Sequence, residues 1–207
     1  MNAVVSTITQ LLPAEIITTD PEQITLYSQD VFTVGPPICA VVRPRNIDEV
    51  QALVRACLER GTPIVTRGGG MSYTSGYIAS APDSVLIDMA SMDAIVEVNL
   101  EDRYVTVEAG CSWQKLHEHL APLGVRTAYW GTLSGRYATV GGGLSQNSIF
   151  WGSGQSGTAA DNVLSVSVVT GKGDLLETGS AAQQHAAPFT RHFGPDLTGV
   201  FLSDCGA

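Results

Sequence analysis

Residues 38–72 read ICAVVRPRNIDEVQALVRACLERGTPIVTRGGGMS, a strand, a helix and a second strand in succession. Ile38–Val42 is a short apolar run that predicts the first strand. The helix begins at Asn46, whose side chain can cap it, and apolar residues then recur at i, i+3, i+4, i+7 and i+8 from Val50. Gly61 ends the helix, and Pro63–Thr66 predicts the second strand. Two strands joined through a helix are expected to run parallel.

A glycine-rich loop, Arg67-Gly68-Gly69-Gly70-Met71-Ser72, follows the second strand directly. Its consecutive backbone N–H groups can cradle an anion of pyrophosphate size, because glycines carry no Cβ to hold a ligand away. Ser72 adds a hydroxyl donor and Arg67 a positive charge. The loop is neither a Rossmann fingerprint, since Tyr73 stands at the third glycine position, nor a P-loop, since no Lys-Ser or Lys-Thr pair follows. A turn without a ligand is the alternative interpretation.

A second glycine cluster, Ala138–Gly143, is followed by Ser145 and Asn147. It lies within Gly131–Gly157, a segment rich in Gly, Ser, Thr and Asn that we expect to be a long, ordered loop. Such loops inside a compact domain are usually functional. Two separate glycine loops with small polar donors suit a long ligand that carries two phosphates and a flat polar ring.

The remaining elements are predicted from β-branched runs, helical periodicity and turn residues. We expect strands at Val85–Met89, Ile95–Asn99 and Tyr104–Ala109, a helix at Ser112–Leu123, and a β-hairpin of Leu164–Val168 with Leu175–Glu177. The chain then runs through apolar Val200–Leu202 to Ala207 without a helix end or a charged tail. We therefore expect that it is interrupted in mid-element.

Composition excludes several classes of function. The net charge is -9 and no basic stripe is visible, which argues against nucleic acid and anionic membranes as partners. No long apolar segment or secretion signal is present, so we expect no membrane span and a cytoplasmic location. The four cysteines, Cys39, Cys57, Cys111 and Cys205, form no C-x-x-C pair, so we expect no metal site.

Several short motifs together indicate a family, although each alone is unspecific. In order they are Tyr27-Ser28-x-Asp30, Ala40–Pro44 with Glu49-Val50, Pro63–Gly70 with Ser72 and Gly76, Ile87–Met89 with Met92, Val105–Gly110, Ala138–Gly142, Gly157 with Asn162-Val163, Gly194–Gly199, and Cys205-Gly206. In this order and spacing the chain resembles the FAD-binding domain of the vanillyl-alcohol oxidase and p-cresol methylhydroxylase (PCMH) superfamily. It is most similar to the FAD-linked 2-hydroxy-acid oxidases and dehydrogenases, such as those for glycolate and D-lactate.

The resemblance implies an α+β, two-lobed PCMH-type domain with FAD between the lobes. Lobe 1 would span about residues 1–90 and lobe 2 about residues 91–207, and the substrate or cap domain would be absent. The residues implied at the cofactor are Arg67, Gly68, Gly69, Gly70, Met71, Ser72, Gly76, Tyr77, Thr132, Ser134, Thr139, Gly141, Gly142, Ser145, Asn147 and Gly157. No catalytic residue is identified, because in the family these come mostly from the other domain.

The implied reaction is oxidation of a 2-hydroxy acid or another alcohol by hydride transfer to the flavin, which passes electrons to oxygen or a redox partner. Alternatives are an NADPH-dependent reductase of the same fold, like the enolpyruvyl-sugar reductase of cell-wall synthesis, a non-catalytic flavin-carrying subunit, and a fold without cofactor. We expect the fragment to be inactive alone. Many relatives attach FAD through a histidine after the glycine run, where this chain has Met71, and Gly131–Gly157 contains no cysteine. We therefore expect FAD to be bound non-covalently within these residues.

Overall fold

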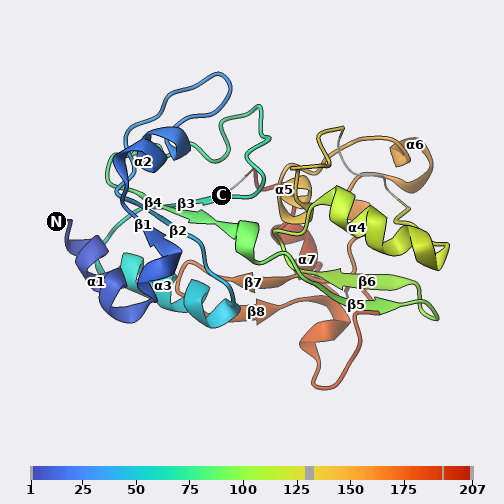
Figure 1. Ribbon diagram of the computed structural model, residues 1–207. Helices are drawn as coiled ribbons and strands as arrows, with labels where there is room; N and C mark the ends of the chain where they lie inside the picture. The colour runs from blue at the N-terminus through green and yellow to red at the C-terminus, as the bar shows by residue number, and fades with distance from the viewer. Residues whose placement is uncertain (1, 129–132, 193, 206–207) are drawn as a thin grey trace. The chain divides into compact units, whose positions relative to one another are not determined.

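The computed structural model describes residues 2–128, 133–192 and 194–205. By their internal contacts these residues divide into two units, which we describe separately (Figure 1). The first unit comprises the described residues within 1–92 together with Val169–Leu175. The second comprises those within 93–168 and 176–205.

The first unit is built on a four-stranded sheet with the order β1-β2-β4-β3. The strands are β1 (Ile17–Thr18), β2 (Ala40–Val42), β3 (Ile64–Arg67) and β4 (Val85–Asp88). The predicted parallel direction of β2 and β3 is confirmed, but the two do not pair with each other. Leu86 of β4 lies opposite both Val41 and Val65, so β4 runs parallel between them. All four residues of β4 are buried, as expected of a central parallel strand.

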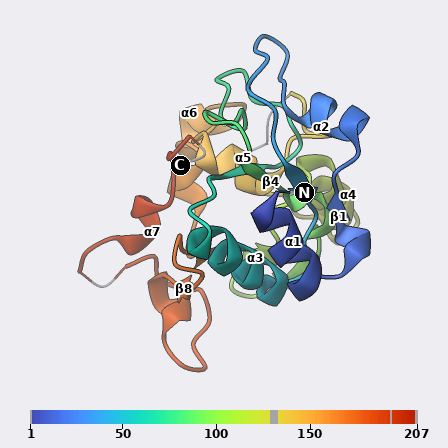
Figure 2. The same cartoon turned by 90° about the vertical axis from the view of Figure 1, so that its left-hand side faces the viewer.

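Helices cover both faces of this sheet (Figures 1 and 2). On one face, α1 (Ala3–Leu11) and α3 (Ile47–Glu59) share a core in which Ile8 and Leu53 meet Val42 of the sheet. On the other face, α2 (Pro21–Tyr27) packs Ile24 and Tyr27 against Val41 and Leu86. Short 3-10 turns, η1 (Ala14–Ile16) and η2 (Met89–Ser91), complete the unit.

The start of α3 follows the sequence prediction. The Asn46 side chain accepts a hydrogen bond from the N–H of Glu49 at 2.9 Å, which caps the helix. Val50, Leu53, Val54 and Cys57 are buried, whereas Leu58, at the end of the predicted apolar face, is 57% exposed. The apolar face therefore ends one position earlier than its periodicity indicates.

The second unit contains an antiparallel pair, β5 (Ile95–Asn99) and β6 (Tyr104–Val107), and α4 (Trp113–Leu120) with the 3-10 turn η3 (Ala121–Leu123). Its apolar core includes Cys111, Leu116, Leu120 and Val140. Ser112 caps α4 by accepting from the N–H of Lys115 at 3.1 Å, as predicted. The prediction of continuous loop between residues 131 and 157 is wrong, because α5 (Val140–Ser145) and α6 (Ser153–Ser156) lie there.

The last part of the chain holds the predicted hairpin, β7 (Ser167–Val169) with β8 (Leu175–Glu177). Its turn belongs to the first unit, where the carbonyl of Gly173 accepts hydrogen bonds from Gln51 at 2.7 Å and Arg55 at 2.8 Å, both on α3. The remaining elements, all of the second unit, are η4 (Ala160–Asn162), η5 (Gly179–Ala182) and α7 (Leu197–Val200).

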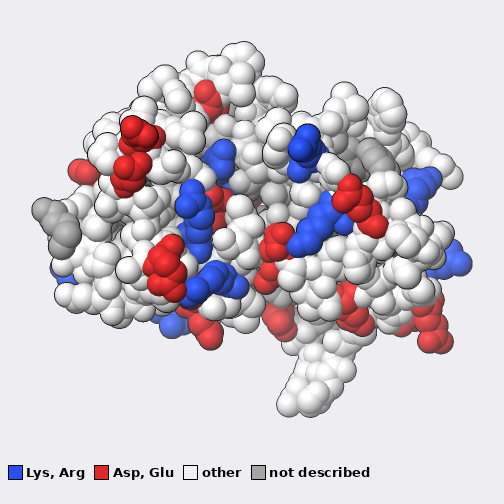
Figure 3. All heavy atoms as spheres, in the orientation of Figure 1, with Lys and Arg blue, Asp and Glu red and all other residues white. Residues whose placement is uncertain are grey.

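Charged groups are interspersed on the surface. On the face shown in Figure 3, basic side chains are scattered among acidic ones. Arg45, for example, pairs with Glu15 at 3.2 Å and Glu49 at 2.9 Å. Within the described residues, no helix has the length and apolarity needed to cross a membrane. The same residues contain no group of three or more His, Cys, Asp or Glu placed to bind a metal ion.

Candidate functional site

The loop after β3, Arg67–Ser72, leaves a run of backbone donors free; we call it the glycine loop. In the part of the chain that the structure describes, no hydrogen bond uses the N–H of Gly68, Gly69, Gly70, Met71 or Ser72. These residues are half-buried, and the loop follows the carboxyl end of a parallel strand, where ligands commonly bind. Consecutive free N–H groups are the donors that bind a phosphate or pyrophosphate group. The residues present therefore fit an anionic ligand.

A side chain at Gly70 would strain the loop and displace the guanidinium of Arg67. The φ of Gly70 is +67°, a conformation that side chains rarely adopt, and an added Cβ would lie 2.6 Å from Cζ of Arg67. The Gly70 carbonyl accepts a hydrogen bond from the hydroxyl of Tyr77 at 2.9 Å. Burial raises the pKa of Tyr77, so its phenol keeps the proton that it donates here. Tyr77 thus fixes the Gly70 carbonyl.

The guanidinium of Arg67 lies between two tyrosine rings. Its Cζ is 4.6 Å from the ring centroid of Tyr27 and 5.3 Å from that of Tyr77, which are distances typical of cation–π contacts. In the described residues Arg67 makes no ion pair and no side-chain hydrogen bond. That Arg67 supplies charge to a ligand stays a prediction.

Asp88, the last residue of β4, anchors Tyr27. It is 1% exposed, and its Oδ2 accepts from the Tyr27 hydroxyl at 2.8 Å and from Nε of Arg43 at 3.1 Å. Arg43 also donates to the Tyr27 hydroxyl at 2.8 Å, and this bond, together with Asp88, raises the pKa of Arg43. Arg43, Arg67 and Asp88 therefore stand together where the parallel strands β2, β3 and β4 end. The sequence analysis assigned no role to Arg43, Tyr27 or Asp88, although all three lie in the family motifs.

The second glycine cluster is organised differently, because its N–H groups are already used. The N–H of Val140 donates to the carbonyl of Cys111 at 2.8 Å, and that of Gly141 to Ala109 at 2.9 Å. The N–H of Gly142 donates to the hydroxyl of Thr139, the N-cap of α5, at 3.2 Å. These donors hold α5 in place, and none of the three is free for a ligand.

The predicted polar side chains of this region are also engaged within the protein. Ser145 donates to the carboxylate of Asp204. The side chain of Asn147 accepts from the N–H of Ala160 at 3.0 Å. Gly157 has a φ of +78°, and a Cβ there would lie 2.5 Å from the carboxylate of Asp161.

The other predicted positions are placed as follows. The Ser72 hydroxyl lies 3.0 Å from that of Thr74, and the Ser134 carbonyl caps a turn by accepting from the N–H groups of Tyr137 and Ala138 at 2.9 Å. Gly76 is half-buried in the turn before Tyr77. Thr132 lies outside the described residues. The structure thus gathers Arg67–Ser72, Gly76 and Tyr77 in the first unit, and Ser134, Thr139, Gly141, Gly142, Ser145, Asn147 and Gly157 in the second.

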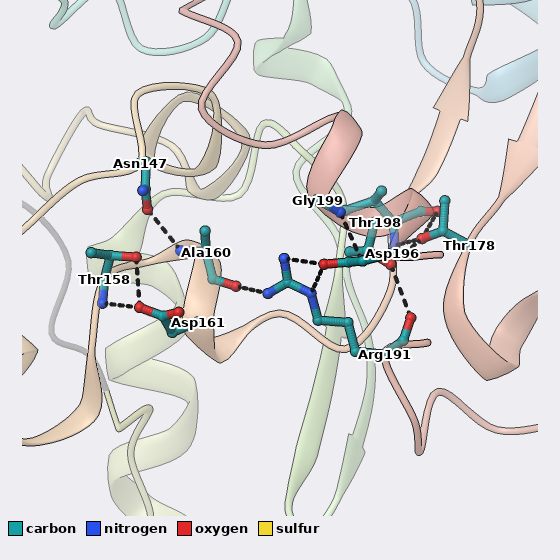
Figure 4. A network of polar contacts seen from close by, with 10 residues as sticks. Asn147, Thr158, Ala160, Asp161, Thr178, Arg191, Asp196, Thr198 and Gly199 are labelled. Carbon is teal, nitrogen blue, oxygen red and sulfur yellow. Dashed lines mark hydrogen bonds and ion pairs between the residues drawn. The ribbon is translucent and has the colours of Figure 1, made fainter. Parts of the chain in front are cut away.

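A polar network in the second unit, which the sequence analysis did not identify, fixes the segment around Gly157 (Figure 4). Arg191 is paired with Asp196 at 2.9 Å and donates to the carbonyl of Ala160 at 2.5 Å. The Asp196 carboxylate, whose pKa this arginine lowers, also caps α7 through the N–H of Gly199 at 2.9 Å. Thr198, fully buried, donates to Thr178. Arg191 therefore ties η4 to the start of α7.

Comparison with known proteins identifies similar sequences over most of the chain. A family model described as FAD binding domain matches residues 38–179. A mitochondrial D-lactate dehydrogenase (cytochrome) of Arabidopsis thaliana is 33% identical over 166 residues, 80% of this chain and 28% of that protein. Glycolate oxidase subunit GlcD of Bacillus subtilis is 29% identical over 81% of this chain and 34% of its own length. D-2-hydroxyglutarate dehydrogenase of Escherichia coli is 36% identical over 67% of this chain and 14% of its own length.

Solved structures of the same fold are also found. The chain matches p-cresol methylhydroxylase with a TM-score of 0.82 and 20% identity, over 96% of this chain and 40% of that one. It matches alkyldihydroxyacetonephosphate synthase with a TM-score of 0.82 and 20% identity, over 98% of this chain and 40% of that one. These matches confirm the predicted α+β, PCMH-type fold. The chain spans less than half the length of each of these proteins.

Proposed function

The chain belongs to the FAD binding domain family, and we propose that it carries the FAD of a flavin-dependent oxidoreductase that oxidises a 2-hydroxy acid. FAD is thus the cofactor, and the resemblance drawn from the motifs is confirmed. The observation that carries the proposal is the pattern of relatives. Three of them are named for D-lactate, glycolate and D-2-hydroxyglutarate, and all three compounds are 2-hydroxy acids.

The residues of this chain would act mainly by binding and positioning. FAD, when bound, supplies the flavin ring that accepts a hydride from the substrate. The free N–H groups of Gly68–Ser72 would hold its pyrophosphate, and the bond between Tyr77 and Gly70 keeps that loop in shape. In the second unit, Ser134, Thr139, Gly141, Gly142, Ser145, Asn147 and Gly157 would shape the loops along the rest of the cofactor. The side chains of Thr139, Ser145 and Asn147 are engaged within the protein, so these three residues would contact FAD through backbone atoms.

The organisation of the whole protein forms part of the proposal. The two units would correspond to the two lobes, of about residues 1–90 and 91–207. The partners would be a small hydroxy acid and an electron acceptor, either oxygen or a redox protein. A net charge of -9 disfavours nucleic acid. We propose a cytoplasmic location, although some relatives are named as mitochondrial.

The test is anaerobic reduction of the flavin in the protein encoded by the complete gene. D-lactate, glycolate, D-2-hydroxyglutarate and NADPH are added separately, and loss of the oxidised-flavin absorption is followed. Reduction by a hydroxy acid but not by NADPH is expected. Reduction by NADPH alone would favour a reductase of the same fold, and reduction by none of the four would favour a flavin carrier. In either case the proposed substrate class would be rejected.

A further inference from the structure

We propose that Arg67 is a positioning residue, whose guanidinium supports the glycine loop from within the protein, between the rings of Tyr27 and Tyr77, and does not bind a phosphate of FAD. The proposal rests on the FAD-binding function of the chain. It concerns how the five free N–H groups are held in a row before the cofactor arrives.

The first argument is where the guanidinium lies. An added Cβ at Gly70 would overlap with it, so Arg67 fills the space that a side chain of residue 70 would occupy. The guanidinium therefore packs against the turn at Gly70. Because only Gly68 and Gly69 separate the two along the chain, the contact closes the loop on itself.

The second argument is what surrounds the charge. Other arginines of the described chain, such as Arg43, Arg45 and Arg191, pair with carboxylates, whereas Arg67 has two aromatic faces. A guanidinium is planar and weakly hydrated and stacks on aromatic faces, whereas an ammonium group is a compact, strongly hydrated point charge. The contacts with Tyr27 and Tyr77 thus hold the guanidinium against two rings.

The third argument is that both rings are anchored. The Tyr27 hydroxyl is bound to Asp88 and Arg43 at the ends of two buried strands. The Tyr77 hydroxyl is bound to the carbonyl of Gly70. A continuous series of contacts therefore runs from the sheet, through Tyr27, Arg67 and Tyr77, to the loop. Movement of Arg67 toward a ligand would break this series in the middle.

The first experiment measures the FAD dissociation constant of the 207-residue chain for Arg67→Lys and Arg67→Met. Both substitutions remove the stacked plane, so both are expected to weaken binding by about tenfold or more, and to a similar extent. If Arg67 instead bound a phosphate of FAD, Arg67→Lys would keep most of the affinity for FAD and Arg67→Met would lose it. That result would overturn the proposal. Arg60→Lys is the matched control, since Arg60 is an exposed residue at the end of α3. It is expected to leave the affinity unchanged.

The second experiment tests the contact of Arg67 with the two rings directly, by measuring the NMR chemical shift of its side-chain Nε–H. In the ligand-free chain this resonance is expected to be shifted upfield by the two rings, and Tyr27→Leu should remove much of the shift. On addition of FAD it should move little. A resonance at the position of an exposed arginine before FAD is added, or one that shifts strongly with FAD, would contradict the proposal. Because the first reading needs no cofactor, it still decides the matter if the wild-type chain fails to bind FAD, which would count against the FAD-binding function alone.

Discussion

Gly141 lies against the backbone of Ala109 so closely that no side chain fits between them. Its N–H donates to the Ala109 carbonyl at 2.9 Å, and an added Cβ would lie 2.8 Å from the Cβ of Ala109. A larger residue would push α5 away from the segment after β6. We therefore expect Gly141→Ala to lower the free energy of unfolding by about 1–3 kcal/mol, measured by urea denaturation. Gly154→Ala is the control, because a Cβ there meets nothing within 4 Å, and equal losses in the two variants would contradict the argument.

Asp88→Asn tests the anchor of Tyr27. The substitution keeps the shape of the side chain but removes the buried charge that faces Arg43. We expect the free energy of unfolding to fall by about 2–3 kcal/mol, less than for a fully buried pair because the Arg43 side chain is 37% exposed. Asp93→Asn is the matched control, because both side chains of the Asp93–Lys115 pair are exposed. Its free energy of unfolding should fall by only about 0–1 kcal/mol. A loss no larger than this control would show that the Asp88 contacts contribute little.

Gly69→Val tests the glycine loop as the pyrophosphate site. A branched side chain in the middle of the free N–H groups should block the phosphate oxygens, so we expect loss of FAD from a protein that still unfolds cooperatively. Flavin absorbance after gel filtration measures retention, and circular dichroism measures folding. The control is Gly171→Val, in the hairpin turn, where a Cβ meets nothing within 4 Å. Normal FAD occupancy in Gly69→Val would exclude this loop as the binding site.

The thiols should differ in reactivity and should make stability depend on pH. Burial raises the pKa of Cys57 to about 12 and that of Cys39 to about 11, whereas Cys205 is exposed. With a disulfide reagent at about pH 8, we expect Cys205 to react at once and Cys57 only on unfolding.

The raised pKa values of Cys39 and Cys57 should also make stability depend on pH. Their contribution to the free energy of unfolding is fully present below the ordinary thiol pKa of 9.0, and it is lost as the pH rises through 11 to 12. Urea midpoints should fall over that range, and less steeply in Cys57→Ala; identical slopes would refute the assignment.

FAD should leave the chain on denaturation. Met71 follows the glycines, and its thioether has no proton to lose, so attack on a flavin carbon would leave a charged sulfonium. After acid precipitation and centrifugation, we expect flavin fluorescence in the supernatant. Fluorescence that stays with the denatured 207-residue polypeptide would mean covalent attachment. Met71→Leu should behave like the wild type in this assay.

The parts of the fold that depend on local pattern could be predicted from the sequence. The helix after Asn46 has a cap, a periodic apolar face and a glycine end, and each is a short-range signal. The position of β4 between β2 and β3 could not be predicted, because strand order depends on long-range pairing. α5 was missed because three glycines have low helix propensity, which packing against Ala109 and Trp113 overrides.

The candidate site was predictable to the same degree. The two glycine clusters look alike in the sequence, because a glycine can lie close to a ligand or close to a neighbouring backbone segment, and the sequence does not distinguish the two cases. Only the hydrogen bonds made by their backbone N–H groups distinguish the two clusters. The N–H of Gly141 is used by Ala109, whereas those of Gly68–Ser72 have no partner among the described residues. The support from Tyr27 and Asp88 could not be predicted, because Tyr27 lies 40 residues from Arg67 and 61 residues from Asp88 along the chain.

The hydrogen bonds from α3 to the turn at Gly173 affect how the chain can fold. Gln51 and Gly173 are 122 residues apart in sequence, yet both belong to the first unit. That unit therefore contains a contact of very long range, and on the ribosome it cannot be completed until the hairpin has emerged. Until then, the polar side chains of Gln51 and Arg55 have no carbonyl to bind. The final closure of the first unit thus waits for most of the second to be synthesised, which couples the assembly of two otherwise separate cores.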